Sequence, residues 1–303
     1  MKRLSLKKGF LILLLILGFS AKSQYAWWVE IHNWDWVSHW SDYMSFQPGT
    51  MGPNALPVPD LQNGRMDTNL TLLVTPEVHL AKNDFTFDIF TRVNIPIKNA
   101  VALQIWWVPF EYYKTDTVVR DFRAARTREA EGTATGDVYL GMLIPLVTDK
   151  EKWPDLMLSI NLKTASGSKL KDARFTDAPG YWFDLSGGKD LPWKNHEGWF
   201  FRPFGSAGFY VYQTNSTIHF QNDALMLGAG LDLKNEKWRF SLQYAQYSGY
   251  WREYDLPKVL RLETEYTHKN LTYHLRLQQG NESYNFTSIR AGVRYNFSPL
   301  LNR

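Results

Sequence analysis

Charged side chains recur at every second position in several segments of this chain. Between residues 260 and 266, Arg261, Glu263 and Glu265 alternate with uncharged residues, most of which are apolar. Successive side chains of a β-strand point to opposite faces, so this spacing gathers charge on one face of a strand. Charges on facing walls of a narrow space either pair, because an unpaired buried charge is costly, or line a passage that selects ions.

The candidates for this role carry both signs and come from most of the strand-like segments. They are Glu77, Asp88, Arg92, Asp137, Lys163, Arg239, Arg261, Glu263, Glu265, Arg276, Arg290 and Arg294, with Asp184 and Asp232 on the same inward faces. If the walls face each other closely, opposite charges pair across the space. The first interpretation is therefore a salt-bridged interior that holds the shape of a closed sheet.

Arginines concentrated near the end of the chain give a second interpretation. Arg239, Arg261, Arg276, Arg290 and Arg294 all come from the last four strand-like segments. If acidic side chains of the first strands do not reach them, they form a cationic wall that favours anionic solutes. Because Glu263, Glu265 and Arg276 lie on neighbouring inward faces, we expect Arg276 to be paired and Arg294 to be open.

Catalytic and metal-binding patterns are not evident. A lipid-modifying barrel enzyme needs a Ser, a His and a polar orienting group within hydrogen-bond reach. The signature of such enzymes, a His followed two residues later by Ser and then Asn-Gly, is absent, and the nearest match at 219–222 lacks the serine. His79 and His274 fall on inward faces, away from lipid. With no metal-ligand spacing and no glycine-rich phosphate loop, we expect no enzyme activity, no metal and no cofactor.

Residues 287–297 show most clearly which element positions these side chains. Ile289, Ala291, Val293, Tyr295 and Phe297 share one face, and polar or cationic residues share the other. In a membrane barrel the apolar face meets lipid, the polar face lines the lumen, and aromatic residues lie at the headgroups. The aromatic end resembles the carboxy-terminal signal of bacterial outer-membrane barrels, although residues 298–303 follow it. This resemblance implies that the barrel assembly machinery recognises the last strand.

The same alternation repeats along the chain. The predicted strands span about 68–80, 87–95, 100–112, 138–144, 156–163, 180–186, 200–212, 225–233, 238–244, 260–266, 271–278 and 287–297. An even number of segments of about ten residues suits tilted membrane strands. We therefore predict an all-β fold: an antiparallel transmembrane β-barrel of about 12 strands formed by residues 66–297.

Connection lengths predict the orientation of this barrel. Long polar stretches at 114–132 and 166–179 alternate with short turns at 97–99 and 235–237. In outer-membrane barrels the long loops lie outside the cell and the short turns lie in the periplasm. The join at 187–197 is longer than a periplasmic turn should be.

The amino-terminal residues 1–23 have the parts of a secretory signal peptide. A basic start precedes the apolar run 10–19, which is too short to span a bilayer as a helix, and small residues follow at 21–23. We expect cleavage after Ser23. With no cysteine in the chain, a lipid-modified cysteine and a disulfide are both excluded.

Composition supports a membrane location and excludes some partners. The net charge is +4, but basic residues of the leader contribute this excess, so the mature chain is close to neutral and nucleic acid is not an expected partner. Aromatic residues make up 16% of the chain, with 13 Trp and 16 Tyr. This content suits two interfacial aromatic belts in contact with outer-membrane lipid.

Residues 24–65 differ from the rest of the chain. Trp27, Ile31, Trp34 and Tyr43 approximate helical spacing, and a Pro- and Gly-rich stretch follows at 47–60. We predict a short amphipathic helix followed by an ordered loop. This Trp-rich segment is interpreted as a plug in the lumen or a periplasmic foot, or as packing that only seals the barrel end.

The middle of the chain resembles a known family. Residues 135–146 begin a strand with Thr-Gly-Asp, and residues 158–167 end the next strand with Lys-Thr-Ala-Ser-Gly. This pattern resembles the outer-membrane family named after the meta-pathway of phenol degradation (MetA-like), although the proline of that family's strand end is missing. The resemblance implies a twelve-strand-like barrel linked to uptake of small, often apolar compounds.

Together these observations predict an outer-membrane β-barrel that acts as a passive channel or uptake protein for small-molecule solutes. One alternative is a structural or adhesive barrel with a closed, salt-bridged lumen. Another is a soluble secreted β-sandwich that binds a ligand, in which the apolar faces would be buried against one another.

Overall fold

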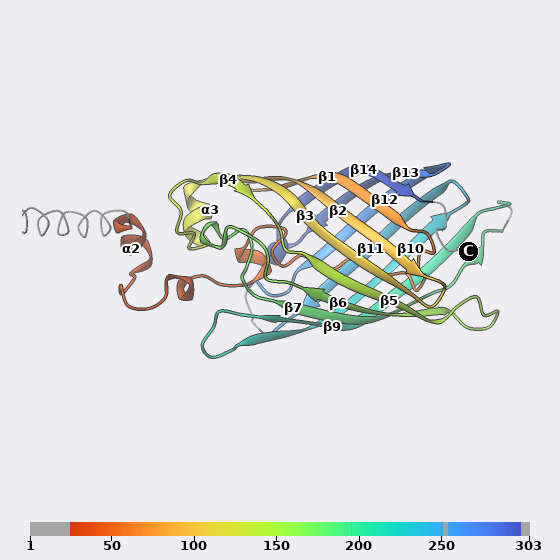
Figure 1. The fold of residues 1–303 in the computed structure, drawn as a ribbon, viewed down its shortest axis with the longest axis horizontal. Coiled ribbons are helices and arrows are strands. Elements are labelled where there is room, and N and C mark those ends of the chain that lie inside the picture. The colour runs from red at the N-terminus through yellow and green to blue at the C-terminus, as the bar shows by residue number, and fades with distance from the viewer. Residues whose placement is uncertain (1–24, 195, 251–253, 298–303) are drawn as a thin grey trace, which may run out of the picture.

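The computed structural model describes residues 25–194, 196–250 and 254–297. The predicted signal peptide at 1–23 and the tail at 298–303 lie outside these residues. A search of the described residues finds no helix with the length and apolar character needed to cross a bilayer. The described residues form an elongated barrel with short helices gathered at one end (Figure 1).

Twelve long strands of the described residues form the barrel wall. They are β1 Thr71–Ala81, β2 Asp84–Ile97, β3 Val101–Thr115, β5 Tyr139–Val147, β6 Asp155–Lys163, β7 Gly180–Gly188, β9 Phe200–Gln213, β10 Gln221–Lys234, β11 Trp238–Ser248, β12 Lys258–His268, β13 Leu271–Gly280 and β14 Thr287–Asn296. Every neighbouring pair is antiparallel, β14 pairs with β1, and the pairing of β9 with β10 completes the ring. The prediction of a twelve-strand antiparallel barrel is confirmed.

Side-chain burial on these strands is the reverse of that in a soluble protein. Leu227, Leu242 and Ile289 are 43%, 47% and 44% exposed on the outer face. On the inner face, Arg261 and Arg290 are only 1% and 7% exposed. Apolar residues outside and charged residues inside are the arrangement of a barrel whose solvent is lipid. The alternative of a soluble β-sandwich is therefore wrong, since the apolar faces are not buried against one another.

The two ends of the barrel differ in their connections. Residues 116–138 and 164–179 connect strands at one end, the long-loop end, which also carries helix α3 (Thr117–Phe122) and the short strand β4 (Glu131–Ala134) (Figure 1). Turns of two or three residues at 98–100, 235–237 and 269–270 lie at the other, the short-turn end. The long join between β7 and β9 also lies at the short-turn end. Within this join, β8 (Leu191–Pro192) pairs with the start of β9 and forms a short hairpin with it.

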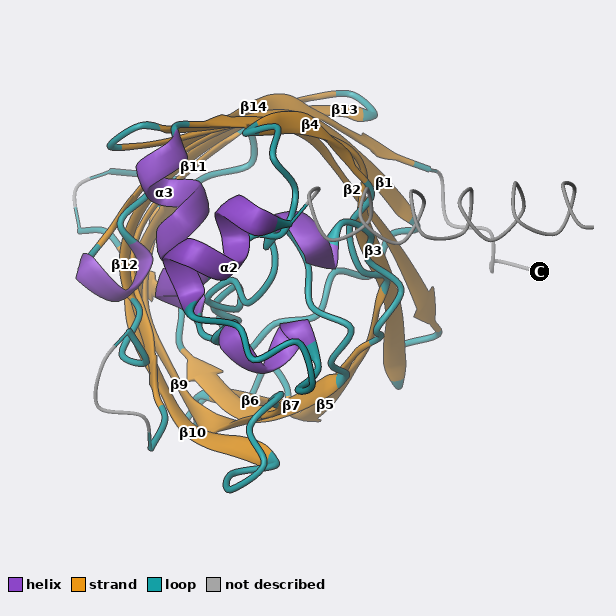
Figure 2. Ribbon diagram, turned by 90° about the vertical axis from the view of Figure 1, so that its left-hand side faces the viewer, coloured by secondary structure: helices purple, strands orange, loops and turns teal. Residues whose placement is uncertain are grey.

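The Trp-rich residues at the amino terminus lie across the long-loop end. Helix α2 (Ala26–His32) is shorter than the spacing through Tyr43 suggests, because Asn33 adopts a left-handed backbone conformation that ends it. The short helices η1 (Trp40–Tyr43) and η2 (Pro48–Thr50) follow. Viewed along the barrel, α2 and α3 cross its opening (Figure 2). Trp28 is fully buried there, and its indole N–H donates to the carbonyl of Ala124 at 3.3 Å.

Residues 52–67, here called the internal segment, run through the barrel interior to the start of β1. At the long-loop end, the amide of Gly52 donates to the carbonyl of Ala173 at 2.8 Å. At the short-turn end, Arg65 bonds Asp155 and Asp190. The segment thus connects the two ends inside the barrel.

One substitution tests which face of the wall meets lipid. Leu242→Arg on β11 places a cation on the apolar outer face, and we expect it to destabilise the barrel by about 2–4 kcal/mol if the residue lies near the bilayer midplane. The measurement is the urea dependence of folding into lipid vesicles. The matched control is Leu242→Phe, which keeps the face apolar. Equal stability of the two variants would contradict the assignment of the outer face.

Candidate functional site

Asp60 of the internal segment lies among three arginines of the barrel wall. Its carboxylate lies 2.5 Å from Arg92 on β2, 2.9 Å from Arg276 on β13 and 4.0 Å from Arg261 on β12. These strands lie on one side of the ring, so Asp60 holds the internal segment against that side. An arginine without such a partner would leave a charge buried in the lumen.

Prolines explain why the internal segment needs this wall. Pro57 and Pro59 fix their own φ angles and keep the chain extended, so the neighbouring carbonyls find no partner within the segment. The guanidinium of Arg261 donates to the carbonyls of Val58 and Pro59 at 2.6 and 2.9 Å. The hydroxyl of Tyr247 donates to Leu56 in the same way. Side chains of the wall therefore replace the hydrogen bonds that a helix or strand would form.

The short-turn end holds the internal segment through Arg65. Its guanidinium lies 2.5 Å from Asp149, 2.9 Å from Asp155 and 2.8 Å from Asp190. Burial alone would raise the pKa of Asp190, but hydrogen bonds from Arg202 and Lys234 and the charge of Arg65 hold it below its usual range. Because the pKa is lowered, this contribution to the folded state is present at neutral pH and is lost as the pH falls into the acid range.

The long-loop side of the lumen contains a second cluster around Asn54 of the internal segment. The Asn54 amide donates to Asp88 at 2.7 Å and to Glu111 at 2.9 Å. Asp88 also bonds His79 Nε2 at 2.8 Å, and Glu111 accepts from Arg174 at 2.8 Å. One neutral amide therefore connects two carboxylates that each have a basic partner.

The arginines predicted to form an open cationic wall are paired. Arg290 lies 2.5 Å from Glu77, Arg239 lies 3.0 Å from Asp232, and Arg294 lies 3.1 Å from Glu265. Arg276 bonds Asp60 and approaches Glu263 at 3.8 Å, while Arg261 is satisfied mainly by carbonyls. The interpretation of an unpaired wall, including the open role expected for Arg294, is wrong because acids of β1, β12 and the internal segment reach these side chains.

The remaining candidates, Asp137 and Lys163, form a buried pair at 2.8 Å near the long-loop end. Lys163 also donates to the hydroxyl of Thr176 and the carbonyl of Ala178, both in the loop between β6 and β7. The Asp137 carboxylate accepts from the amide of Gly167. This pair therefore fastens a long loop to the wall.

Ser288, His79 and Asp88 form a hydrogen-bonded chain that resembles a catalytic triad. His79 Nδ1 lies 2.7 Å from Ser288 Oγ and Nε2 lies 2.8 Å from Asp88. Ser288 is 1% exposed and does not line the lumen cavity described below, so a substrate carbonyl has no route to its hydroxyl. A nucleophile must contact its substrate, and we interpret this chain as structural.

Ligand atoms of Glu77, His79 and Asp88 lie within 4.8 Å of one another, which the sequence spacing did not reveal. Strand pairing places Asp88 on β2 directly opposite Glu77 on β1. These ligand atoms already form hydrogen bonds with Arg290, Ser288 and Asn54. The positive charge of the Arg290 guanidinium would also repel a metal cation. The donor set therefore does not fit a metal ion.

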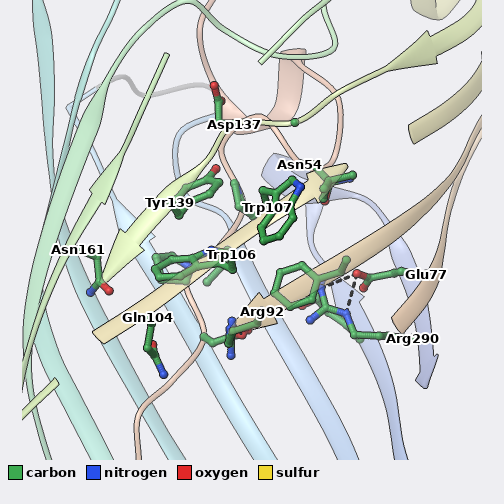
Figure 3. A pocket seen from close by; sticks show the side chains of 18 of the residues that line it. Asn54, Glu77, Arg92, Gln104, Trp106, Trp107, Asp137, Tyr139, Asn161 and Arg290 are labelled. Carbon is green, nitrogen blue, oxygen red and sulfur yellow. Dashed lines mark hydrogen bonds and ion pairs between the residues drawn. The ribbon is translucent and has the colours of Figure 1, made fainter. Parts of the chain in front are cut away.

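A cavity lies beside the internal segment in the lumen, between the aromatic part of the wall and the part that carries Arg92, Arg276 and Arg290 (Figure 3). The centres of water molecules can occupy about 80 Å³ of this cavity, and by the same measure a single water needs about 10–15 Å³. Figure 3 shows Tyr139, Trp106 and Asn161 on one side of it and Glu77 with Arg290 on the other. The cavity therefore has room for several waters or a small solute.

Aromatic rings form the wall that faces the internal segment across this cavity. Trp106 and Tyr139 are stacked with centroids 5.3 Å apart, and Trp182 meets Tyr210 edge to face at 5.3 Å. All four line the cavity, and Asp184 lies among them. These rings were not among the residues predicted from the sequence to line the lumen, although Trp106, Tyr139 and Trp182 alternate with residues of the outer face. Sequence analysis also missed Asp60, Asn54 and Arg65, which lie in a segment without strand periodicity.

Comparisons with known proteins concern the fold. No family model and no curated protein matches the sequence, so the resemblance to the MetA-like family is not shown. An outer-membrane channel from Pseudomonas putida F1 is 10% identical, covers 80% of this chain and 100% of its own, and has a TM-score of 0.55. LpxR from Salmonella typhimurium is 9% identical over 75% of this chain and 100% of its own, with a TM-score of 0.49. The KdgM porin in complex with disordered oligogalacturonate is 11% identical over 76% and 100%, with a TM-score of 0.44.

The likeness to the Pseudomonas putida channel shows the same kind of barrel. Together with the exposed apolar outer face, it identifies the chain as an outer-membrane β-barrel. Lipid of that membrane is the environment of the outer face.

Proposed function

We propose that this barrel is an uptake channel for small solutes, in which the internal segment acts as a plug. The observation that carries this proposal is the unfilled space in the lumen beside the internal segment. The internal segment is held against β12, β13 and β2 through Asp60, yet a cavity lined by the segment, by these strands and by aromatic rings of the remaining wall stays open beside it. A barrel built only as a scaffold gains nothing from such a space, because an empty cavity forfeits packing contacts.

Transport in this proposal is passive and selects by size. Among the described residues the lumen arginines have carboxylate or carbonyl partners, so no ring of fixed charge attracts one sign of ion. A solute enters at the long-loop end, occupies the cavity and leaves at the short-turn end when the internal segment moves. Movement of the segment limits the rate.

The last strand supports the proposed route of assembly. Tyr295 and Phe297 at its end are 40% and 37% exposed on the outer face, where the assembly machinery would recognise them. This assignment places the short-turn end in the periplasm and the long-loop end outside the cell. The amino-terminal helices would then cover the outer opening.

A structural barrel with a closed lumen is the second candidate. Its support is the set of ion pairs that join the internal segment to the wall at Asp60 and at Arg65. This candidate predicts a barrel that folds and inserts normally but conducts nothing.

Conductance and solute flux decide between the two candidates. Purified protein without its leader is reconstituted in planar bilayers and in liposomes loaded for swelling assays. We expect discrete openings and swelling with solutes the size of glycerol or small sugars, and none with oligosaccharides. Silence in both assays, with correct folding shown by heat-modifiable gel mobility, would reject the channel and favour the structural barrel.

A further inference from the structure

Asp184 on β7 differs from the other lumen carboxylates. Glu77, Asp137 and Asp232 each lie within 3.0 Å of a basic nitrogen, whereas none of the described residues forms an ion pair with Asp184. Its carboxylate accepts a hydrogen bond from the hydroxyl of Ser206 at 2.8 Å. Asp184 is 3% exposed, so its charge has neither bulk water nor a cation as compensation.

The position of Asp184 makes it accessible to a solute inside the barrel. It lines the aromatic cavity and also a smaller cavity next to Pro59 and Leu61. Gly208 lies directly opposite on β9, and a Cβ there would lie 2.7 Å from the Cβ of Asp184. Only glycine fits this close approach, so the residue directly opposite adds no side chain over the carboxylate, and Ser206 is the residue of β9 that hydrogen-bonds it.

Flat apolar surfaces lie beside this carboxylate. Trp182 precedes Asp184 by two residues on the same face of β7, about 6.6 Å along the strand. Tyr210 pairs with Trp182 across the β7–β9 ladder and is 1% exposed. The spacing between the Asp184 carboxylate and the Trp182 ring therefore matches a ligand in which one or two carbons join a charged group to an aromatic ring.

Tyr139 provides an independent sign that a ligand belongs in the cavity. Its side chain is 6% exposed and lines the same cavity, yet its hydroxyl has no hydrogen-bond partner among the described residues. Buried hydroxyls are normally satisfied, so an unpartnered one at a cavity wall indicates a partner supplied by the occupant.

We propose that the cavity binds a small organic ammonium ion with a flat apolar body, the ammonium at Asp184 and the body against Trp182 and Tyr210. An ammonium donates charge-assisted hydrogen bonds to the carboxylate and is attracted to the ring faces. The inference names the solute class of the proposed channel and rests on that function for its meaning in transport, although binding can be measured without transport.

Three probes of similar size test the proposal by calorimetry on the full barrel in detergent. They are 2-phenylethylamine, 2-phenylethanol and 3-phenylpropionate, which are cationic, neutral and anionic. We expect the amine to bind at least about tenfold more tightly than the alcohol, which is the effect of one hydrogen bond to a charged group. The anion should bind most weakly.

Two variants separate the charge from the aromatic surface. Asp184→Asn keeps the shape and should abolish the preference for the amine while leaving alcohol binding within about twofold. Trp182→Leu should weaken binding of both the amine and the alcohol, because both place their apolar body against this ring. The matched control is Glu131→Gln, which removes an exposed carboxylate outside the cavity and outside the internal segment and should change nothing.

The outcomes are distinguishable from failure of the channel itself. If wild-type protein binds the amine and the alcohol equally, or if Asp184→Asn leaves the preference intact, the cation inference is wrong. Swelling with a small neutral solute is measured on the same preparations. Flux without amine preference rejects only this inference, whereas absent flux with intact amine preference rejects the channel and leaves a binding barrel.

Discussion

Asp60→Asn is expected to raise the open probability of the channel by roughly a hundredfold, with a channel that is always open as the upper limit. The amide keeps the shape of the side chain but leaves Arg92, Arg276 and Arg261 around an uncharged group. Removing one partner of a buried ion pair costs about 3–5 kcal/mol. We take the lower end because Asp60 is 26% exposed. Each 1.4 kcal/mol is about a tenfold change in an equilibrium constant.

Loss of these ion pairs destabilises mainly the state in which the internal segment plugs the lumen. Once the internal segment leaves, water fills the lumen and solvates the three guanidinium groups, so the released state does not need Asp60. The measurement is the open probability of single channels in planar bilayers. An unchanged open probability in Asp60→Asn would show that the segment does not gate conduction.

A reversible crosslink gives the opposite control. A Cβ added at Gly228 on β10 would lie 2.5 Å from Leu61 Cδ1, so the internal segment contacts the wall there. Because the chain has no cysteine, Leu61→Cys with Gly228→Cys introduces the only thiols. We expect the oxidised protein to be silent and the reduced protein to conduct. The same contact means that Gly228→Arg would displace the internal segment.

Arg290→Gln is expected to lower the stability of the barrel by about 3–5 kcal/mol. The side chains of Arg290 and Glu77 are both buried, lie on the paired strands β14 and β1, and are 2.5 Å apart. The substitution leaves Glu77 as a buried charge without its partner, beside Asp88 on β2. The measurement is the urea midpoint of folding in lipid vesicles, with the reversal potential recorded on the same variant.

Two further variants make this prediction specific. Glu77→Gln combined with Arg290→Gln removes both charges and should recover much of the lost stability. Arg294→Gln is the matched control, because Arg294 lies on the same strand but is 28% exposed, and we expect a loss of about 1 kcal/mol or less. A shifted reversal potential in Arg290→Gln without a change in midpoint would mean that Arg290 selects ions and does not hold the barrel together.

The sequence by itself determined the barrel, because the pattern that specifies it is local. A strand has a period of two, so Ile289 and Arg290 fall on opposite faces whatever the rest of the chain does. In a soluble protein the apolar face of a strand lies in the core, whereas in a membrane barrel it faces lipid. The aromatic content and the even number of ten-residue segments indicated the membrane case. The twelve strands and their inward charges were therefore readable without tertiary information.

Only the tertiary structure decided which charges meet and what remains free. Arg276 and Asp60 are 216 residues apart, and Arg290 and Glu77 are 213 apart. Partners at such separation are set by ring closure and by a segment whose prolines give it no periodicity. Likewise, Asp184 has no ion-pair partner among the described residues because of where all of its neighbours lie in the folded barrel. Local spacing assigns a side chain to a face, but pairing, a cavity and an unpartnered carboxylate depend on distances across the lumen, which no local pattern contains.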